Sequence, residues 1–281
     1  MPGELDPQYV VARSVLLDAL GALASQRAAV ILVGAQAIYL HTGVIEFAVA
    51  EFTTDADITL DPALLQPAPE IESAMTVAGF HRAKRVGAWF VSRDIGGVAT
   101  NVEVDLMVPE AVGGPGSRAA RLLGHAKHVA RKARGLEASL IDKSATTITA
   151  LETIDARSFS VAVAGPAALI VSKLHKIRER LAEREHRRLD AKDALDVLRL
   201  LQAIPTRDLT MTFAKLLGTE VSKEVTREAL TSLKDLFSTQ RGAGSQMAVR
   251  AAGPLASADE IAGSCAVLAT DLLDAISNEG S

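Results

Sequence analysis

The segment Thr54-Asp-Ala-Asp-Ile-Thr-Leu60 alternates polar with apolar residues and is followed by Asp61-Pro62. This period of two predicts a β-strand that ends at the proline. Residues two apart on a strand point to the same face, so Asp55 and Asp57 would present their carboxylates together. Like charges this close repel one another unless a cation lies between them. Hard oxygen ligands at this spacing suit Mg²⁺, which keeps water or substrate phosphates in its remaining positions.

A glycine turn lies upstream of this acid pair. Ala29-Val-Ile-Leu-Val33 is a short β-branched run closed by Gly34, and we expect a short helix over Gln36 to His41. The order strand, glycine, helix exposes backbone N–H groups and a helix N-terminus to a phosphate. The turn matters because the acid pair alone is weak evidence: acidic residues on the solvent face of any strand give the same spacing.

A third acid lies on a later strand. Asn101-Val-Glu-Val-Asp-Leu-Met-Val108 alternates throughout and places Glu103 and Asp105 on one face. We expect an antiparallel neighbour of the first strand to bring Asp105 beside Asp57. Three carboxylates can hold two metal ions about 3.5–4 Å apart.

The other patterns predict a mixed α+β fold with a short mixed sheet and a helical C-terminal lobe. A strand is expected at 88–92, with Gly96-Gly97 as the hairpin connection to 101–108, and further strands around 138–141 and 159–163. Beyond Gly165-Pro166 the chain is helical, apart from a break at 242–254. We therefore divide it into three parts, listed here: a core at 1–112, a basic β-rich connecting segment at 113–165, and a helical domain at 166–281.

Composition indicates a soluble cytoplasmic protein. The single Cys265 excludes an intramolecular disulfide and a cysteine zinc site among these 281 residues. The first residues have no basic signal-peptide region, and the longest apolar stretch, 28–40, is far below a membrane span of about 20 residues.

Net charge argues against a protein that coats nucleic acid by bulk charge, because the total is −4. The distribution is uneven, however, since residues 118–134 hold six basic side chains and no acid. They are Arg118, Arg121, Lys127, Arg131, Lys132 and Arg134. Such a patch suits a phosphate-bearing ligand at a defined site, although a solvated charged face gives the same pattern.

The helix after Pro166 carries a second basic group. Lys173, Lys176 and Arg180 lie at i, i+3 and i+7 on one face, where a lysine can bind nucleotide phosphates as a compact charge. Pairing with nearby glutamates is the alternative. Asp193 and Asp196 share the face of a later helix and act either in catalysis or in capping and ion pairs with neighbouring bases.

Four segments of the chain resemble the AbiEii/MenT-like nucleotidyltransferases, toxins of bacterial toxin–antitoxin systems that have a polymerase-β-like catalytic fold. They match, in order, the family's glycine turn, its DxD metal motif, its helix-borne lysine and its late aspartate. The segments are Val33-Gly-Ala-Gln-Ala-Ile-Tyr-Leu-His-Thr-Gly43, Thr53-Thr-Asp-Ala-Asp-Ile58, Ala168-Leu-Ile-Val-Ser-Lys-Leu-His-Lys-Ile177 and Lys192-Asp-Ala-Leu-Asp-Val-Leu198.

The resemblance implies that Asp55 and Asp57 bind metal, that Lys173 binds the triphosphate, and that Asp193 is the late essential acid, with Asp196 as the competing choice. Two departures stand out. Ala35 occupies a position where the family usually has Gly or Ser, and a Thr-x-Arg element after the lysine is not evident.

These observations lead to a hypothesis of Mg²⁺-dependent transfer of a nucleotide from an NTP to an RNA hydroxyl, which the resemblance suggests is a tRNA 3′ end. Asp55, Asp57 and Asp105 would hold the metals, with Lys173 and Asp193 completing the catalytic set. The candidate nucleotide-binding residues are Gly34, Ala35, Thr54, Lys173 and Lys176. A toxin of this kind would have a cognate antitoxin as its partner. The alternatives are a small-molecule acceptor, such as an antibiotic, and a non-catalytic nucleotide-binding protein.

Overall fold

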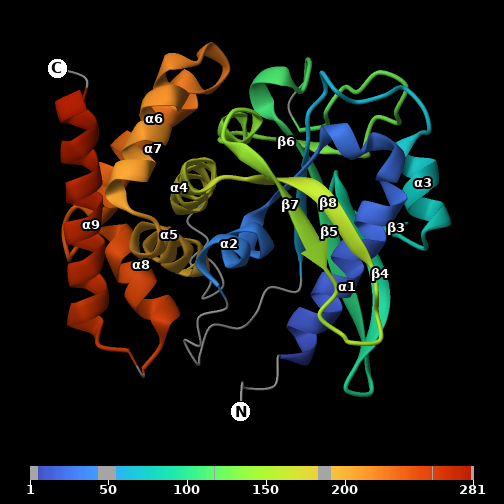
Figure 1. The fold of residues 1–281 in the computed structure, drawn as a ribbon, viewed down its shortest axis with the longest axis horizontal. Helices are drawn as coiled ribbons and strands as arrows, with labels where there is room; N and C mark the ends of the chain where they lie inside the picture. The colour runs from blue at the N-terminus through green and yellow to red at the C-terminus, as the bar shows by residue number, and fades with distance from the viewer. Residues whose placement is uncertain (1–5, 44–54, 117, 183–190, 255, 280–281) are drawn as a thin grey trace. The chain divides into compact units, whose positions relative to one another are not determined.

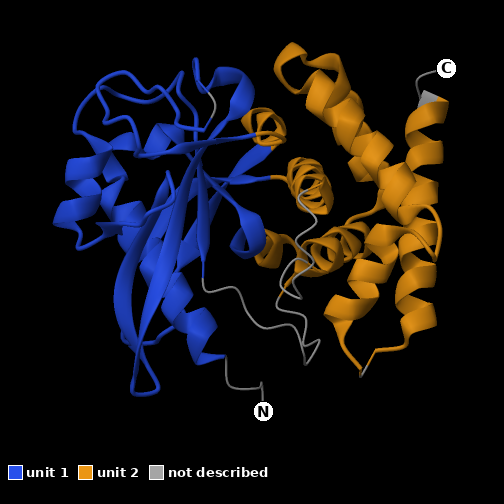
Figure 2. Ribbon diagram, turned by 180° about the vertical axis from the view of Figure 1, so that it is seen from behind, with its two compact units in different colours: residues 1–37, 52–133, 143–164 blue, residues 38–51, 134–142, 165–281 orange. Residues whose placement is uncertain are grey.

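The computed structural model describes residues 6–43, 55–116, 118–182, 191–254 and 256–279. They form a mixed α+β protein with a mixed sheet and a helical C-terminal region, as predicted (Figure 1). The chain divides into two compact units (Figure 2). Unit 1 takes in residues 1–37, 52–133 and 143–164, and unit 2 takes in residues 38–51, 134–142 and 165–281, as far as these are described.

Unit 1 is built on one mixed sheet whose strands follow the order β3-β4-β5-β2-β1-β8-β7, with β6 paired to β5. The strands are β1 (Val30–Val33), β2 (Ala56–Leu60), β3 (His81–Arg82), β4 (Ala88–Ile95), β5 (Val98–Pro109), β6 (Arg131–Ala133), β7 (Lys143–Thr149) and β8 (Ser158–Ala164). The expected hairpin is confirmed, because β4 and β5 pair antiparallel with Ile95 opposite Val98. β1 lies inside the sheet and is buried along its whole length, which is why its sequence is uniformly apolar.

Helix α1 (Pro7–Ala22) covers one face of this sheet. Its N-cap is Asp6, which accepts a hydrogen bond from the Gln8 amide, and Pro7 takes the first helical position. Arg93 of β4 forms an ion pair with Asp18 of α1 at 2.7 Å, which places α1 over the face that Arg93 occupies. Ile58 of β2 and Val104 of β5 lie on that same face by strand alternation and register, and both are fully buried.

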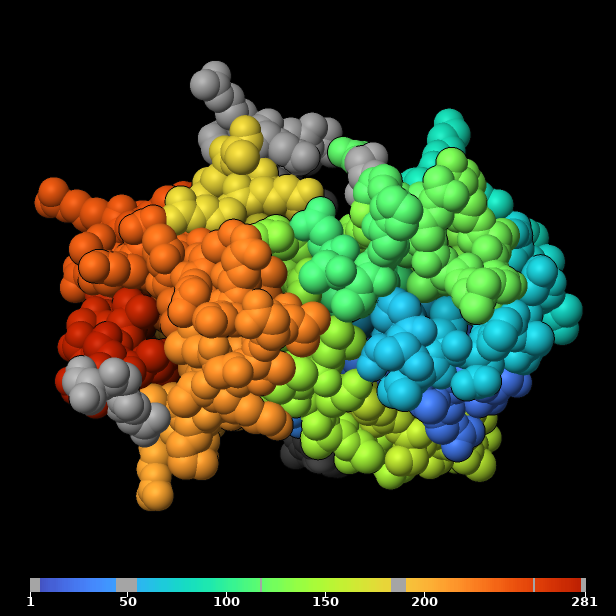
Figure 3. Space-filling view, turned by 90° about the horizontal axis from the view of Figure 1, so that it is seen from above, coloured from blue at the N-terminus to red at the C-terminus, as the bar shows by residue number. Residues whose placement is uncertain are grey.

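The remaining elements of unit 1 are short and lie between its strands. They are η1 (Ala24–Ala29), α3 (Ile71–Val77) and η2 (Glu110–Val112), while α2 (Gly34–Thr42) starts in unit 1 at the end of β1. The loop around His125 lies against the segment that leads into α3, at the surface of unit 1 (Figure 3). His125 accepts a hydrogen bond from the Ile71 amide and donates one to the Gln66 carbonyl, so this histidine has a structural role.

One prediction about the sheet is wrong. We expected β2 and β5 to be antiparallel, whereas they are parallel, with Asp57 directly opposite Asp105. The β4–β5 hairpin explains the error, because its sequence does not reveal which of its two strands lies next to β2. β5 takes that place, and its direction is opposite to that of β4.

Unit 2 is helical. Its elements are η3 (Glu137–Leu140), α4 (Pro166–Ala182), α5 (Lys192–Ala203), α6 (Thr206–Gly218), α7 (Glu220–Phe237), α8 (Ala243–Ala252) and α9 (Ala258–Glu279). Phe213 and Phe237 are fully buried in its core. No helix in the described part of the chain is both long enough and apolar enough to cross a membrane.

Two further expectations for local structure are wrong. In the segment 138–141, expected as a strand, residues 138–140 belong to the 3₁₀ turn η3, and β7 begins at Lys143. The expected break at 242–254 contains α8. Gly244 allows close packing there, since a Cβ at this position would lie 2.5 Å from the Phe237 ring.

The two units are divided differently from the three predicted parts. The predicted connecting segment, 113–165, contributes β6, β7 and β8 to the sheet of unit 1, while residues 134–142 group with unit 2. Strand pairing explains this, because β7 and β8 form a hairpin and β8 also pairs with β1 in parallel.

Candidate functional site

The predicted site residues belong to both units, and each group forms its own cluster. Unit 1 holds the glycine turn and the carboxylates, at positions 34, 35, 55, 57 and 105. Unit 2 holds the lysines and the late aspartates, at positions 173, 176, 193 and 196. Thr54 lies outside the described residues.

Asp57 and Asp105 share the sheet face opposite α1. They are partners in the parallel register of β2 and β5, so their side chains leave neighbouring strands on the same side. Asp57 is half-buried and Asp105 is buried, while Asp55 immediately precedes β2 and is exposed. The structure thus brings Asp57 and Asp105 together, as expected, although through a parallel pairing.

Gly34 lies directly against the Asp57 carboxylate. A Cβ at position 34 would lie 2.1 Å from Asp57 Oδ2 and 2.7 Å from the Asp57 Cβ. The backbone of Gly34 also has φ +71°, a left-handed conformation that costs side-chain-bearing residues about 1–2 kcal/mol. Glycine is therefore required here for space as well as for conformation. The contact places a carboxylate at the start of α2, where the helix dipole favours negative charge.

The first turn of α2 is held to α1 by buried polar contacts. Arg13 donates from Nε to Gln36 Oε1 at 3.0 Å, and Gln36 donates in turn to the Ala12 carbonyl at 3.3 Å. Arg13 also donates to the Tyr9 hydroxyl and to the Thr149 carbonyl. Because Gln36 lies two residues after Gly34, these bonds fix the turn against which Asp57 packs.

One carboxylate oxygen of Asp105 accepts hydrogen bonds from two arginines, and the other oxygen has no hydrogen-bond partner. Arg85 donates to Asp105 Oδ2 at 2.7 Å, and Arg131 donates to the same oxygen at 3.2 Å. Asp105 Oδ1 is buried without a hydrogen-bond partner, as are Arg131 Nε and Thr59 Oγ1 on the neighbouring strands β6 and β2. An unsatisfied buried polar group costs about 1–3 kcal/mol. Three such atoms on adjacent strands therefore need an explanation, and a bound ion or ordered water at this place provides one.

These residues fit a hard divalent cation, but they are not gathered into a finished ligand set. Within the described ranges, no group of three or more His, Cys, Asp or Glu side chains is close enough to hold a metal ion. The donors nevertheless match Mg²⁺ chemistry, since Asp57 and the open Oδ1 of Asp105 are carboxylate oxygens on adjacent strands. Asp55, Asp57 and Asp105 would hold the ion, and Arg85 and Arg131 compete with it for Asp105.

In unit 2, Lys173 of α4 forms buried ion pairs with both candidate late acids on α5. Its ammonium lies 2.6 Å from Asp193 Oδ1 and 2.7 Å from Asp196 Oδ2. Burial by itself lowers the pKa of Lys173, but the two carboxylates outweigh burial and hold that pKa above its ordinary value. Lys173 is therefore a charged residue, and both late aspartates contact it.

Asp193 interacts with all three bases of the basic face predicted on α4. Besides Lys173, Arg180 donates a hydrogen bond to Asp193 Oδ2, and Lys176 Nζ lies 3.7 Å from Oδ1. Burial raises the pKa of the Asp193 carboxyl, but these three cations outweigh burial and hold the pKa well below its usual range. The three bases spaced i, i+3 and i+7 on α4 thus all interact with one buried acid on α5. Arg187 and Arg188, two of the bases that precede Asp193 in the sequence, lie outside the described residues.

Four contributors to these clusters were missed by the sequence analysis. Arg199 donates to Asp196 Oδ1 at 3.2 Å, and its i+3 spacing from that acid was a usable signal. Tyr39 of α2 is linked to Arg199 and Asp196, and burial, followed by the Asp196 charge, raises its pKa. For Arg85 and Arg131, no local spacing indicates the ion pairs with Asp105, because strand pairing creates them.

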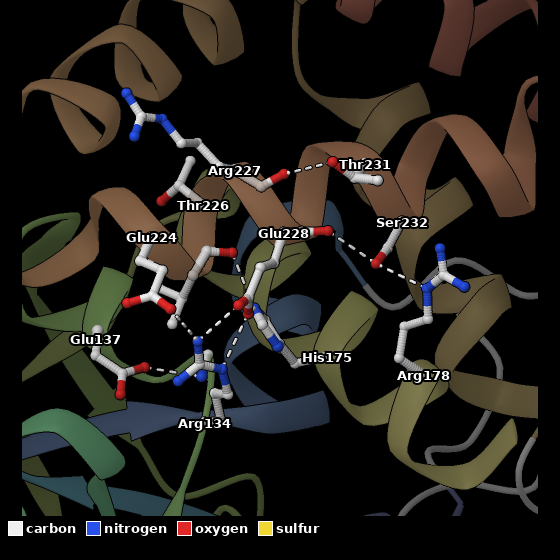
Figure 4. A network of polar contacts seen from close by, with 12 residues as sticks. Arg134, Glu137, His175, Arg178, Glu224, Thr226, Arg227, Glu228, Thr231 and Ser232 are labelled. Carbon is white, nitrogen blue, oxygen red and sulfur yellow. Dashed lines mark hydrogen bonds and ion pairs between the residues drawn. The ribbon is translucent and has the colours of Figure 1, made fainter. Parts of the chain in front are cut away.

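The basic segment 118–134 is partly committed to internal contacts. Arg131 binds Asp105, and Lys132 donates to the Gly114 carbonyl at 2.9 Å. Arg134, in unit 2, pairs with Glu224 and Glu228 of α7, and His175 lies in the same network (Figure 4). Arg118, Arg121 and Lys127 are exposed, and so is Arg134 despite its ion pairs.

Substitution of Gly34 tests the contact with Asp57. We expect Gly34→Ala to lower the free energy of unfolding by more than Gly79→Ala, by about 1–3 kcal/mol, because Gly34→Ala adds a clash to the backbone strain. Gly79 is the matched control, since its φ is +85° and no atom lies within 4 Å of an added Cβ. Urea unfolding of both variants measures the difference. Equal destabilisation would show that the Gly34–Asp57 contact is not tight.

The buried ion pairs of Lys173 predict a pH-dependent defect. Lys173→Met leaves Asp193 and Asp196 without their shared cation, which should cost about 3–5 kcal/mol at pH 7. Lys176→Met, at a half-exposed side chain, should cost about 0–1 kcal/mol. The depressed pKa of Asp193 means that its contribution is complete above the unfolded carboxyl pKa, about 3.9, and is lost as pH falls through the folded pKa.

The difference between wild type and Lys173→Met should therefore shrink when unfolding is measured at pH 3 instead of pH 7. A difference that is constant with pH would contradict this account. So would a Lys176→Met defect as large as that of Lys173→Met.

No protein-family model, no curated protein and no solved structure matches the chain. The likeness to AbiEii/MenT-like nucleotidyltransferases stays a prediction from four sequence segments, and the function that follows from it is a proposal.

Proposed function

We propose that the chain is a Mg²⁺-dependent nucleotidyltransferase that transfers a nucleotide from an NTP to a hydroxyl group of RNA. One observation carries the proposal. The Asp57 carboxylate lies against the Gly34 turn at the start of α2 and stands in register with Asp105 on the adjacent strand. A nucleotidyl transfer site needs these two elements side by side: carboxylates for a cation and backbone N–H groups for the phosphates that the cation accompanies.

In this proposal each part of unit 1 has a defined task. Asp55 and Asp57 hold the cation at the start of β2, and Asp105 adds a third carboxylate. The amides of Gly34 and Ala35 bind phosphate oxygens at the helix N-terminus. Bound Mg²⁺ would supply an activated acceptor hydroxyl and neutralise charge on the departing pyrophosphate. The order of strand, glycine turn, helix, DxD strand and adjacent third acid also supports a polymerase-β-like core.

The cluster in unit 2 supports binding of a polyanion. Lys173, Lys176, Arg180 and Arg199 carry four positive charges against the two of Asp193 and Asp196. Lys173 is buried between both acids, while Lys176 is half-exposed. We assign Lys173 to positioning the acids as well as to its expected role toward the triphosphate, with Lys176 as the cation more open to a ligand.

An RNA acceptor, which the resemblance narrows to a tRNA 3′ end, is supported by the exposed bases Arg118, Arg121 and Lys127. From the same resemblance we propose that the protein is a cytoplasmic toxin with a protein antitoxin as its partner. A small-molecule acceptor and a non-catalytic nucleotide-binding role are the competing functions, and the assay below separates all three.

The test is transfer of label from each NTP, supplied singly with Mg²⁺, to total tRNA. We expect RNA to be labelled, and Asp57→Asn to lower the rate by at least about 10²-fold, because the substitution removes a metal-binding charge. Asp94→Asn is the matched control, an exposed strand acid of the same unit that should retain activity.

Each other result has a distinct meaning. Label transferred only to a small-molecule acceptor, supplied in a parallel reaction in place of tRNA, would replace the RNA acceptor. Nucleotide binding that is independent of Mg²⁺, without transfer to any acceptor, would favour the non-catalytic role. Equal labelling by wild type and Asp57→Asn would refute the proposed site.

A further inference from the structure

We propose that Arg85 is a further substrate-binding residue, which neutralises Asp105 in the metal-free protein and transfers to the polyphosphate when a divalent cation takes Asp105. This inference rests on the proposed function, and it adds a residue to which the resemblance gives no role.

Arg85 binds two carboxylates of β5 with one guanidinium. Nη1 donates to Asp105 Oδ2 at 2.7 Å and Nη2 donates to Glu103 Oε2 at 2.8 Å. Its side chain is 52% exposed, whereas that of Asp105 is only 9% exposed. Asp105 stays in the sheet and keeps Arg131 as a partner when Arg85 leaves, so release of the half-exposed arginine does not leave a buried acid unpaired.

The backbone that carries Arg85 is firmly anchored. Two residues later, Gly87 accepts a hydrogen bond from the Leu106 amide at 2.7 Å. Its own amide donates to the His128 carbonyl at 3.2 Å. A Cβ on Gly87 would lie 2.5 Å from the Leu106 carbonyl oxygen and 2.6 Å from the Arg131 amide, so the turn packs tightly onto β5 and β6. A fixed base with an exposed tip lets the guanidinium change partners without moving the sheet.

Asp105 has the features of a carboxylate that is available as a metal ligand. Its Oδ1 is buried and has no partner, and its neighbour in register is Asp57. The charges of Arg85 and Arg131 balance those of Glu103 and Asp105, so this group is neutral in the metal-free protein. A divalent cation adds two positive charges at Asp105, and repulsion then favours release of the exposed arginine.

The released guanidinium suits a phosphate. Arginine binds phosphate oxygens through two parallel N–H donors, and it would be displaced at the point where a metal-bound polyphosphate arrives. Arg131 remains beside Asp105, with a buried Nε that has no hydrogen-bond partner. The exchange therefore gives Arg85 opposite effects on the two ligands: it competes with the bare cation and assists the cation–polyphosphate complex.

The test measures binding rather than turnover. Free Mn²⁺ is titrated into the full chain and followed by its electron paramagnetic resonance signal, first alone and then with pyrophosphate. We expect Arg85→Ala to bind Mn²⁺ alone about two- to fivefold more tightly, the range that loss of an exposed ion pair allows. Binding of Mn²⁺–pyrophosphate should weaken at least about tenfold, because a charged hydrogen-bonding partner is lost.

Arg82→Ala is the matched control. Arg82 lies in the same unit, is 42% exposed and pairs with a single acid, Glu72, so its loss should leave both affinities unchanged. Arg85→Lys is the second variant and keeps the charge without the paired donors, so it should retain the Mn²⁺ affinity of wild type and lose part of the pyrophosphate affinity.

The opposite signs separate an exchange from a structural role. If Arg85→Ala weakens both ligands, or leaves Mn²⁺ affinity unchanged, the exchange is refuted. Asp57→Asn distinguishes this failure from failure of the proposed function. Loss of Mn²⁺ binding in Asp57→Asn, with no gain in Arg85→Ala, overturns the exchange and retains the metal site. Mn²⁺ binding that is insensitive to Asp57→Asn overturns both.

Discussion

The contact between the Asp57 carboxylate and the backbone of Gly34 is the constraint around which unit 1 is arranged. No Cβ fits between them, and the left-handed conformation of Gly34 turns the chain from β1 directly into α2. Arg13 and Gln36 then hold the first turn of α2 against α1 through buried hydrogen bonds. These contacts put a carboxylate and a helix N-terminus in one place, which is the combination that a cation–phosphate ligand requires.

Charge compensation follows the same design in both units. A buried acid is costly unless it is paired, and each unit pairs its acids with both sheltered and more exposed cations. In unit 1 these are Arg131 and the half-exposed Arg85. In unit 2 they include the buried Lys173 and the half-exposed Lys176, beside Arg180 and Arg199. The sheltered cation keeps the acid charged and in place, while in our proposal the exposed one exchanges for a ligand. On that proposal, stability and binding depend on different members of each cluster.

Local patterns predicted much of this arrangement, and pairing between distant segments supplied the rest. Alternation identified β2 and β5, and the glycine after a buried run identified the turn into α2. The direction of β5 relative to β2 was mispredicted because either strand of the β4–β5 hairpin can pair with β2, and the two strands run in opposite directions. Arg85 was missed for a related reason: its partners lie on β5, 18 and 20 residues later, and only strand pairing brings them together. At η3, Glu137 is buried and accepts a hydrogen bond from the Gly135 amide, a local bond that competes with strand formation.

The proposed function requires Asp57 and Asp105 to become ligands of one metal site beside the Gly34 turn. The most direct measurement is a crystal structure of the full chain with Mn²⁺ and a non-hydrolysable NTP analogue, with the metal located by its anomalous scattering. We predict a metal peak within bonding distance of Asp57 and Asp105, phosphate oxygens at the Gly34 and Ala35 amides, and Arg85 moved from Asp105 to the phosphates. A bound nucleotide at another place, with Asp105 still held by Arg85 and no metal at Asp57, would contradict it.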